Sequence, residues 1–419
     1  MATVGANWAG NYEYRATRLH APRGMEELQD LVRRSPAIRA LGSRHSFNDL
    51  ADTSGDLVSL ASMPAEVTLD AAARTVRVNA GASYGAVAGE LQAAGRALGN
   101  LASLPHISIA GAIATGTHGS GRRNGSLADA VTALELVDGT GMLRRFERDA
   151  DPDFPGTVVA LGALGIVTTV ELRVEPAYEV AQHVFDALPF EDALENLSAV
   201  LGAAYSVSLF TSWRGPVIDQ AWVKRRIDEP EPGRNFFGAT AAPVDRHPIA
   251  SMPALNATPQ LGVPGPWLDR LPHFKLAFTP SAGDELQSEY LVPFDSAVPA
   301  LRVLDGLAGR IAPLLQICEI RTIRADDLWL SPAYGTDALA LHFTWIQDQL
   351  AVTAFLPELE RVLEPFAARP HWGKLFELRA GRMADLYPRL GDFRRLASEL
   401  DPDGKFRNDY LERVVFGGD

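Results

Sequence analysis

The sequence predicts a two-domain α+β fold, and three observations support this. The chain has 419 residues, which is longer than one ordinary hydrophobic core accommodates. Helical and strand-like patterns are mixed along its whole length. A second series of strands and helices begins after Pro176. We therefore predict one domain over residues 1–176, a second over 177–368, and a C-terminal segment, 369–419, that returns to the first.

The first domain is predicted as an α+β unit with many Gly-rich connections. Apolar residues recur at helical spacing in two segments, and short alternating or apolar runs that stop at glycine indicate strands. Asp138-Gly-Thr-Gly141 between two such runs is typical of a hairpin. The predicted helices span residues 24–34 and 84–94, and the predicted strands span 37–41, 75–78, 131–137, 142–146 and 166–174.

The second domain is predicted from the same patterns, apart from one long irregular segment. Residues 229–280 are rich in proline and have no clear period, but Phe236, Phe237, Trp267 and Phe274 indicate an ordered excursion, since disorder needs no such aromatic residues. We predict helices at 190–204, 297–311 and 351–366, and strands at 205–213, 220–227, 286–291, 315–323 and 339–345. Short helices and loops follow residue 369.

Composition limits the partners. A net charge of −13 argues against nucleic acid or an anionic membrane as the main partner. No apolar run approaches the length of about 18 residues that a membrane span needs, and the polar N-terminus shows no secretory signal. The single Cys318 excludes an intrachain disulfide and suits a reducing compartment. We expect a cytoplasmic, monomeric protein without a metal site.

Lysine is rare in this chain. Only Lys224, Lys275, Lys374 and Lys405 are lysines among 39 basic residues. Because arginine is the default cation here, each lysine is a candidate for a specific role, although an ordinary surface position is the commoner explanation for any one of them.

Three loops rich in glycine and hydroxyl groups stand out in the first domain. The dinucleotide fingerprint G-x-G-x-x-G at a strand-to-helix turn is absent, so a Rossmann dehydrogenase is poorly supported. The loops are Leu41–Ser46, Ser103–Ala112 and Thr115–Gly121. Glycine lets backbone N–H groups approach an anion closely, so three such loops within 80 residues indicate a long ligand with a central pyrophosphate rather than three plain turns.

These loops resemble the cofactor loops of the vanillyl-alcohol-oxidase-type FAD family. Ala40-Leu-Gly-Ser-Arg-His-Ser-Phe-Asn48 is similar to the family's covalent-flavin site, and Ile109-Ala-Gly-Ala-Ile-Ala-Thr-Gly-Thr-His-Gly119 to its second FAD loop. Gly162-Ala-Leu-Gly-Ile-Val-Thr168 and Asp401-Pro-Asp-Gly-Lys-Phe-Arg-Asn408 resemble its third loop and C-terminal signature. The resemblance covers nearly the whole chain, and it implies a two-domain FAD-binding fold in which the second domain covers the flavin.

Four further segments resemble the members of that family that oxidise alditols: Leu104-Pro-His-Ile107, Cys318-Glu-Ile-Arg-Thr322, His342-Phe-Thr344 and Pro370-His-Trp-Gly-Lys374. The resemblance implies a flavin bonded covalently to His45. It places the following residues around FAD: Gly42, Ser43, Arg44, His45, Ser46, Ser103, Ser108, Gly111, Thr115, Gly116, Thr117, His118, Val167 and His371. It implies catalytic roles for Glu319, Arg321, His342 and Lys374, and a substrate pocket of Ser103, Glu319, Arg321, Thr344 and Lys374.

The strand patterns support this pocket independently of the resemblance. Glu319 and Arg321 are two residues apart on a predicted strand, so both face one side, where Ile317 and Ile323 are their neighbours. His342 and Thr344 repeat the arrangement on the next strand. Buried charge is costly unless it is paired or used. A structural Glu–Arg ion pair remains the alternative.

We therefore expect an oxidase that transfers a hydride from C1 of an alditol such as xylitol or sorbitol to FAD, with O₂ reduced to H₂O₂. Two alternatives stay open. One is a sugar-lactone (aldonolactone) oxidase or dehydrogenase of the same family, which the FAD loops do not exclude. The other is a non-catalytic flavin- or sugar-binding protein, against which the charged groups of the second domain argue.

Overall fold

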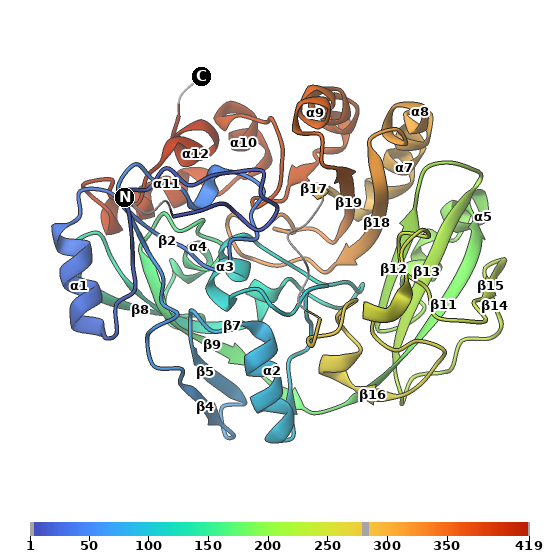
Figure 1. Ribbon diagram of the computed structural model, residues 1–419, viewed down its shortest axis with the longest axis horizontal. Helices are drawn as coiled ribbons and strands as arrows, with labels where there is room; N and C mark the ends of the chain where they lie inside the picture. Colours follow the sequence, from blue (N-terminus) through green and yellow to red (C-terminus); the bar gives the residue numbers. More distant parts are fainter. Residues whose placement is uncertain (1–3, 279–284, 418–419) are drawn as a thin grey trace.

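The computed structural model describes residues 4–278 and 285–417, and its two largest sheets are formed by successive parts of the chain (Figure 1). The smaller of the two is a five-stranded antiparallel sheet in the order β4-β5-β9-β7-β8. Its strands are β4 (Val67–Asp70), β5 (Thr75–Asn79), β7 (Val131–Val137), β8 (Leu143–Glu147) and β9 (Ile166–Arg173). Alternate residues of β5 and β9 are buried, which places one face of this sheet on the core.

A parallel three-stranded sheet precedes it in the chain and carries the first Gly-rich loop. It consists of β1 (Arg18–His20), β2 (Ile38–Ala40) and β3 (Asp56–Val58) in the order β1-β3-β2. The helices of this half are α1 (Met25–Arg34), α2 (Tyr84–Ala93), α3 (Ile109–Ala114) and α4 (Phe154–Thr157), and β6 (Arg96–Ala97) pairs with β10 (Glu175–Pro176). The predicted helices at 24–34 and 84–94 and the predicted hairpin at 138–141 are confirmed.

The second large sheet has ten strands, with β14-β15-β11-β13-β12-β18-β19-β17-β20 as its continuous order and β16 attached to β11. Its strands are β11 (Glu179–Pro189), β12 (Ser206–Thr211), β13 (Val217–Arg226), β14 (Asn235–Phe236), β15 (Ala239–Ala241), β16 (Gly265–Pro266), β17 (Glu285–Pro293), β18 (Leu315–Ile323), β19 (Ala338–Ile346) and β20 (Arg369–Pro370). All of the paired strands described in this sheet are antiparallel.

The α-helices described for this part of the chain pack on one face of the sheet. They are α5 (Phe190–Glu195), α6 (Leu197–Leu201), α7 (Ala297–Gly306), α8 (Ala308–Ile311) and α9 (Gln349–Leu363). Leu301 and Leu304 of α7 and Phe355 and Leu359 of α9 recur at helical spacing and join one buried cluster with side chains of β17, β18 and β19. The side chains that alternate with these on the same three strands point to the opposite face.

Two of the predicted helices are wrong in length. The segment 190–204 forms two short helices that meet at Asn196, whose side-chain amide donates to the carbonyl of Asp192. The segment 297–311 is likewise divided, with Gly306 and Leu307 at the break. Glycine has low helix propensity, which accounts for the second break. The excursion at 229–280 is ordered as predicted over its described part, while residues 279 and 280 lie outside the described residues.

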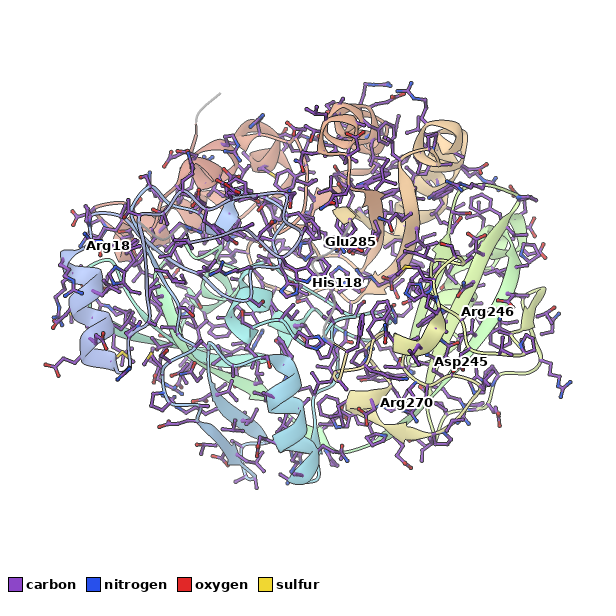
Figure 2. The ribbon with its side chains drawn as sticks, in the orientation of Figure 1. Arg18, His118, Asp245, Arg246, Arg270 and Glu285 are labelled. Atoms are coloured by element: carbon purple, nitrogen blue, oxygen red, sulfur yellow. The ribbon has the colours of Figure 1, made fainter. Side chains whose placement is uncertain are left out.

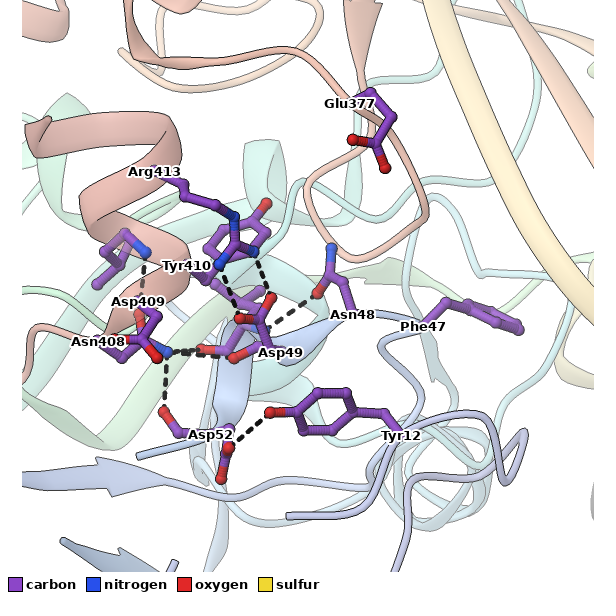
Figure 3. A network of polar contacts seen from close by, with 12 residues as sticks. Tyr12, Phe47, Asn48, Asp49, Asp52, Glu377, Asn408, Asp409, Tyr410 and Arg413 are labelled. Atoms are coloured by element: carbon purple, nitrogen blue, oxygen red, sulfur yellow. Dashed lines mark hydrogen bonds and ion pairs between the residues drawn. The ribbon is translucent and has the colours of Figure 1, made fainter. Parts of the chain in front are cut away.

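The C-terminal helices pack against the first part of the chain (Figure 1). They are α10 (Ala380–Leu386), α11 (Leu390–Leu400) and α12 (Asp409–Leu411), and Met383, Phe393 and Tyr410 belong to the same buried cluster as Leu28 of α1. Figure 3 shows the polar part of this contact. The Asn408 amide donates to the carbonyls of Asp49, Leu50 and Asp52, and Arg413 pairs with the Asp49 carboxylate. The tail thereby supports the segment that follows His45.

Within the described ranges, no helix combines the length and the apolar character that crossing a membrane requires.

Candidate active site

A single cavity of about 500 Å³ brings together nearly all of the predicted site residues. This volume lies in the range typical of ligand and cofactor sites. Figure 2 labels His118 and Glu285, which line the cavity near the middle of the molecule, between the five-stranded and the ten-stranded sheets. The predicted residues that line it are Gly42, Ser43, Arg44, His45, Ser46, Ser103, Ser108, Gly111, Thr115, Thr117, His118, Val167, Glu319, Arg321, His342, Thr344, His371 and Lys374.

Gly116 is the exception, because it is not among the lining residues. Its φ is +68°, and a Cβ there would meet Pro332 Cδ at 2.9 Å. Gly116 therefore shapes the turn between Thr115 and Thr117 rather than the wall of the cavity.

The loop side of the cavity has the properties of a cofactor cradle. A Cβ on Gly42 would lie 2.5 Å from Ser108 Oγ, and one on Gly111 would lie 2.8 Å from the same atom, so a side chain at either position would displace the Ser108 hydroxyl. The Ser108 N–H donates to Ser43 Oγ at 3.1 Å, which joins the first two loops. Ser108 Oγ is buried without a hydrogen-bond partner in the protein. Since buried hydroxyls are normally paired, this atom fits a ligand oxygen.

His45 is also held ready for a ligand. Its ring stacks on Trp8 with the centroids 5.4 Å apart, and its Nδ1 is buried without a hydrogen-bond partner in the protein. Burial lowers the pKa of His45 to about 4, so the imidazole is neutral at pH 7. A neutral ring has a nitrogen lone pair, which covalent attachment of a flavin would need.

The loop of His45 is tied to the turn that carries Lys374. The Phe47 N–H donates to the carbonyl of Gly373 at 2.8 Å, and the Asn48 amide donates to the carbonyls of Trp372 and Lys374 at 2.9 and 2.8 Å. These three hydrogen bonds fix the loop of His45 relative to the turn that carries Lys374.

The opposite wall is the face of the ten-stranded sheet that the helices leave free. In the registers of β18, β19 and β17, Glu319 lies opposite His342, and His342 lies opposite Glu289. Thr344 lies opposite Gln287 in the next row on this face. Directly paired side chains on one face are close enough to interact, so three strands present a continuous polar surface to the cavity.

Glu289 is the centre of this surface, and the sequence analysis did not select it. Its carboxylate contacts Arg321 Nη2 at 2.6 Å and Lys374 Nζ at 2.8 Å. His118 Nε2 and His342 Nδ1 lie 3.2 and 3.5 Å from it. Burial alone would raise the pKa of Glu289, but Lys374 and Arg321 hold it well below its usual range. Glu289 therefore stays ionised and keeps both cations in place.

Glu319 is held from the other side by a histidine that was also missed. His273 Nε2 lies 2.7 Å from Glu319 Oε1, and Arg321 Nε lies 3.7 Å from Oε2. Burial would raise the pKa of Glu319, but Arg321 and His273 hold it well below its usual range. His273 belongs to the proline-rich excursion, where no periodicity pointed to it.

Lys374 and His342 form a contact that can hold a proton. Lys374 Nζ is within hydrogen-bond distance of His342 Nδ1, and His342 Nε2 lies 3.3 Å from Thr344 Oγ1. Burial lowers the pKa of His342 to about 4, and burial lowers the pKa of Lys374 as well. The His342 ring is therefore neutral at pH 7 and can accept a proton, and it titrates as a coupled pair with Lys374, which also contacts the Glu289 carboxylate.

A cavity with a cofactor cradle at one wall and ionised and basic groups at the other suits a cofactor-dependent enzyme, and similarity to known proteins identifies the cofactor as FAD. Residues 17–147 match the family model described as an FAD binding domain, and residues 284–414 match the model of D-arabinono-1,4-lactone oxidase. The fold is similar to that of the solved cholesterol oxidase from B. sterolicum, with a TM-score of 0.78 and 16% identity over 98% of this chain and 96% of that one.

Similarity to individual proteins narrows the class of FAD-dependent enzymes to which this chain belongs. The chain is 49% identical to the alditol oxidase of Streptomyces sp. (strain IKD472 / FERM P-14339) over the full length of both proteins. It is 28% identical to the L-gulono-1,4-lactone dehydrogenase of Mycobacterium tuberculosis (strain ATCC 25618 / H37Rv) over 99% of this chain and all of that protein. The chain belongs to the alditol oxidase family and is an FAD-dependent enzyme, which confirms the resemblance of its motifs.

Proposed function

We propose that this protein oxidises the C1 hydroxyl of alditols such as xylitol and sorbitol to the aldose, and that O₂ accepts the electrons and becomes H₂O₂. The observation that carries the proposal is the polar wall of Glu319, Arg321, His342 and Lys374 in the same cavity as the FAD loops. A polyol is uncharged and rich in hydroxyl groups, so it needs a pocket with several charged donors and acceptors. The full-length likeness to an alditol oxidase supports this choice.

The residues around the loop side of the cavity fit FAD. We propose that the three Gly-rich loops and Val167 hold the cofactor, with Ser103 beside its ring and His371 near the polar edge of the ring, and that His45 bonds to its 8-methyl carbon. The unpartnered Ser108 Oγ and His45 Nδ1 and the tight glycines at 42 and 111 support this. When bound, FAD supplies an acceptor for the hydride from C1 and a route for the electrons to O₂.

The protein's part in the reaction is to orient the substrate and to take up its hydroxyl proton. Arg321 and Lys374 would hydrogen-bond the C1 oxygen and stabilise the negative charge that develops on it. Glu319 would accept a hydrogen bond from the neighbouring hydroxyl, while Ser103 and Thr344 would line the pocket. The proton would pass to His342, whose ring burial keeps neutral and whose Nδ1 contacts Lys374 Nζ.

The substrate can be tested by anaerobic bleaching of the yellow holoenzyme. We expect xylitol and sorbitol to bleach the flavin and air to restore its colour, with H₂O₂ formed. L-gulono-1,4-lactone tests the first alternative, since a lactone oxidase or dehydrogenase would bleach with the lactone and not with a polyol. Failure of both compound classes to bleach the flavin would favour a non-catalytic binding protein.

The access of O₂ to the flavin gives a second test of the proposed oxidase reaction. Ala102 is buried, lines the cavity and precedes Ser103. A small side chain there would leave O₂ a path to the flavin, so we expect Ala102→Val to slow reoxidation by air much more than reduction by xylitol. An artificial electron acceptor should then restore turnover. Stopped-flow traces in which both half-reactions slow equally would instead make Ala102 a packing residue.

The remaining features of the protein also stay proposals. We propose a monomeric enzyme of the cytoplasm that uses neither nucleic acid nor membrane as a partner. The predicted boundaries at residues 176 and 368 stay predictions. Strand β10, which pairs with β6 of the first part of the chain, ends at Pro176, and this supports the first boundary. Strand β20 (Arg369–Pro370) pairs with β17, so the ten-stranded sheet continues two residues past the second boundary.

A further inference from the structure

Lys224 is a fully buried lysine that the reaction proposed above does not use. It lies on β13 with 1% of its surface exposed. Its Nζ contacts three acceptors, which are the carbonyls of Leu271 and Pro272 at 2.5 and 3.0 Å and His273 Nδ1 at 3.1 Å. When His273 Nδ1 is an acceptor, all three groups need a donor, and an ammonium group has three N–H donors whereas a neutral amine has two.

The contact with Glu319 decides which nitrogen of His273 carries the proton. An ionised carboxylate can only accept, so Nε2, which lies 2.7 Å from Glu319 Oε1, carries the proton of the neutral ring, and Nδ1 is left as an acceptor for Lys224 Nζ. Burial and the charge of Lys224 lower the pKa of His273 to about 4, so the ring stays neutral at pH 7. Edge contacts with Phe210 and Trp222, at 5.6 and 5.2 Å between centroids, fix the plane of the ring.

The same loop also holds the other side of the cavity. The backbone N–H groups of His273 and Phe274 donate to the carbonyl of Ser103 at 3.2 and 3.4 Å, and His106 Nε2 contacts the carbonyl of Leu276 at 2.8 Å. His273 is thus connected through its main chain to the loop beside the flavin site and through its side chain to Glu319.

We propose that Lys224 and His273 are positioning residues of the active site, which occupy one oxygen of Glu319 and so present the other to a hydroxyl group of the substrate. The inference rests on the proposed polyol oxidation, because it takes Glu319 as the acceptor for the hydroxyl next to C1. Lys224 acts through His273, and His273 acts through Glu319. This arrangement of Lys224, His273 and Glu319 would affect the dissociation constant of the polyol more than the rate at which the bound polyol reduces the flavin.

Two substitutions of His273 separate its two hydrogen bonds. In His273→Gln the side-chain amide can reach the place of Nε2 and donate to Glu319, while in His273→Asn the shorter amide reaches only the place of Nδ1 and faces Lys224. We expect H273N to weaken xylitol binding by about 10- to 100-fold, the scale of a lost hydrogen bond to a charged group. We expect H273Q to recover most of that loss. The limiting rate of flavin reduction should change by less than the binding constant in both variants.

A pH profile tests the role of Lys224. The titratable and charged groups that face it are His273 and Glu319, with Arg321 behind Glu319. Burial lowers the pKa of Lys224 to about 7. The charged form of Lys224 supports the contact between His273 and Glu319. The wild-type enzyme should therefore bind xylitol more weakly as the pH rises through about 7 and Lys224 loses its proton. Lys224→Met should bind xylitol weakly at pH 6 and lack this step, while the exposed Lys275→Met should behave like the wild type.

The experiment is anaerobic stopped-flow reduction of the four variant holoenzymes and the wild type over a range of xylitol concentrations from pH 6 to 9. Equal losses of affinity in H273N and H273Q would overturn the proposal, as would a K224M profile parallel to that of the wild type. If K224M does not fold, the two His273 variants decide the matter. If the wild type is reduced by L-gulono-1,4-lactone and not by xylitol, the polyol function fails, and the same variants measured with the lactone still test the positioning.

Discussion

Lys374→Met is expected to keep its flavin and to lose about 100-fold or more in the rate of anaerobic flavin reduction. The substitution keeps most of the volume of the side chain and removes its charge. Lys374 Nζ lies between the Glu289 carboxylate and His342 Nδ1, in the wall that faces the FAD loops. Loss of this group removes both a donor to the C1 oxygen and the partner of the proton acceptor. Arg321→Ala and Glu319→Gln should likewise keep flavin and lose turnover.

Lys374 also neutralises the buried Glu289 carboxylate, so K374M can lower the stability of the fold as well as the rate of flavin reduction. The experiment therefore needs a variant that affects stability alone. Lys405→Met is a matched control, since Lys405 Nζ donates only to the carbonyls of Val32 and Arg33 at the end of α1. We expect K405M to lower the melting temperature and to leave flavin reduction unchanged. If K374M, R321A and E319Q all reduce flavin at the wild-type rate, these residues form only a structural ion-pair cluster.

The sequence predicted which residues form the polar wall of the cavity better than it predicted which of them contact one another. Glu319 and Arg321 could be placed together because residues two apart on a strand share a face, and both side chains line the cavity. The pairing of Glu319 with His342, and of His342 with Glu289, could not be predicted in this way. Register depends on contacts between strands far apart in the chain, and the pattern within one strand does not contain it.

Glu289 and His273 show two different limits of the sequence analysis. Glu289 stands in the middle of a strand that was predicted from its apolar residues, and an acid at such a position was a usable signal. His273 gave no comparable signal, because the excursion that carries it has no period. Its position depends on the contact of that loop with β13 and β18. Lys224 was noted for its rarity, but only the fold shows that it is buried beside His273.

Local structure was predicted well where periodicity was strong and less well where a single residue interrupted it. Helix α1 has its apolar residues on one face and acidic residues in its first turn, and it was predicted almost to its ends. The break at Asn196 depends on a side-chain hydrogen bond to the backbone that competes with the helix, which the apolar spacing of 190–204 hides. The error affects the outer face of the large sheet and leaves the cavity unchanged.

His45→Ala is expected to release its FAD on denaturation, whereas acid-precipitated wild-type protein should stay yellow. His45 lines the cavity, stacks on Trp8 and keeps its Nδ1 free of protein partners. With a pKa lowered to about 4 by burial, its imidazole is neutral over the working pH range and has the lone pair that a bond to carbon needs. We expect most activity to be lost with the covalent bond.

His106→Ala is the control for this experiment, because His106 is near enough to lower the pKa of His45 but contacts the carbonyl of Leu276 instead of lining the cavity. H106A should therefore keep its flavin in the precipitate. The absorbance of pellet and supernatant after acid precipitation distinguishes the outcomes. Wild-type protein that leaves all of its flavin in the supernatant would exclude a covalent bond, and His45 would then serve only as one wall of a non-covalent FAD site. Flavin retained in the H45A precipitate would place the covalent bond on a different side chain, and the loop of His45 would then lose the role that its sequence predicts.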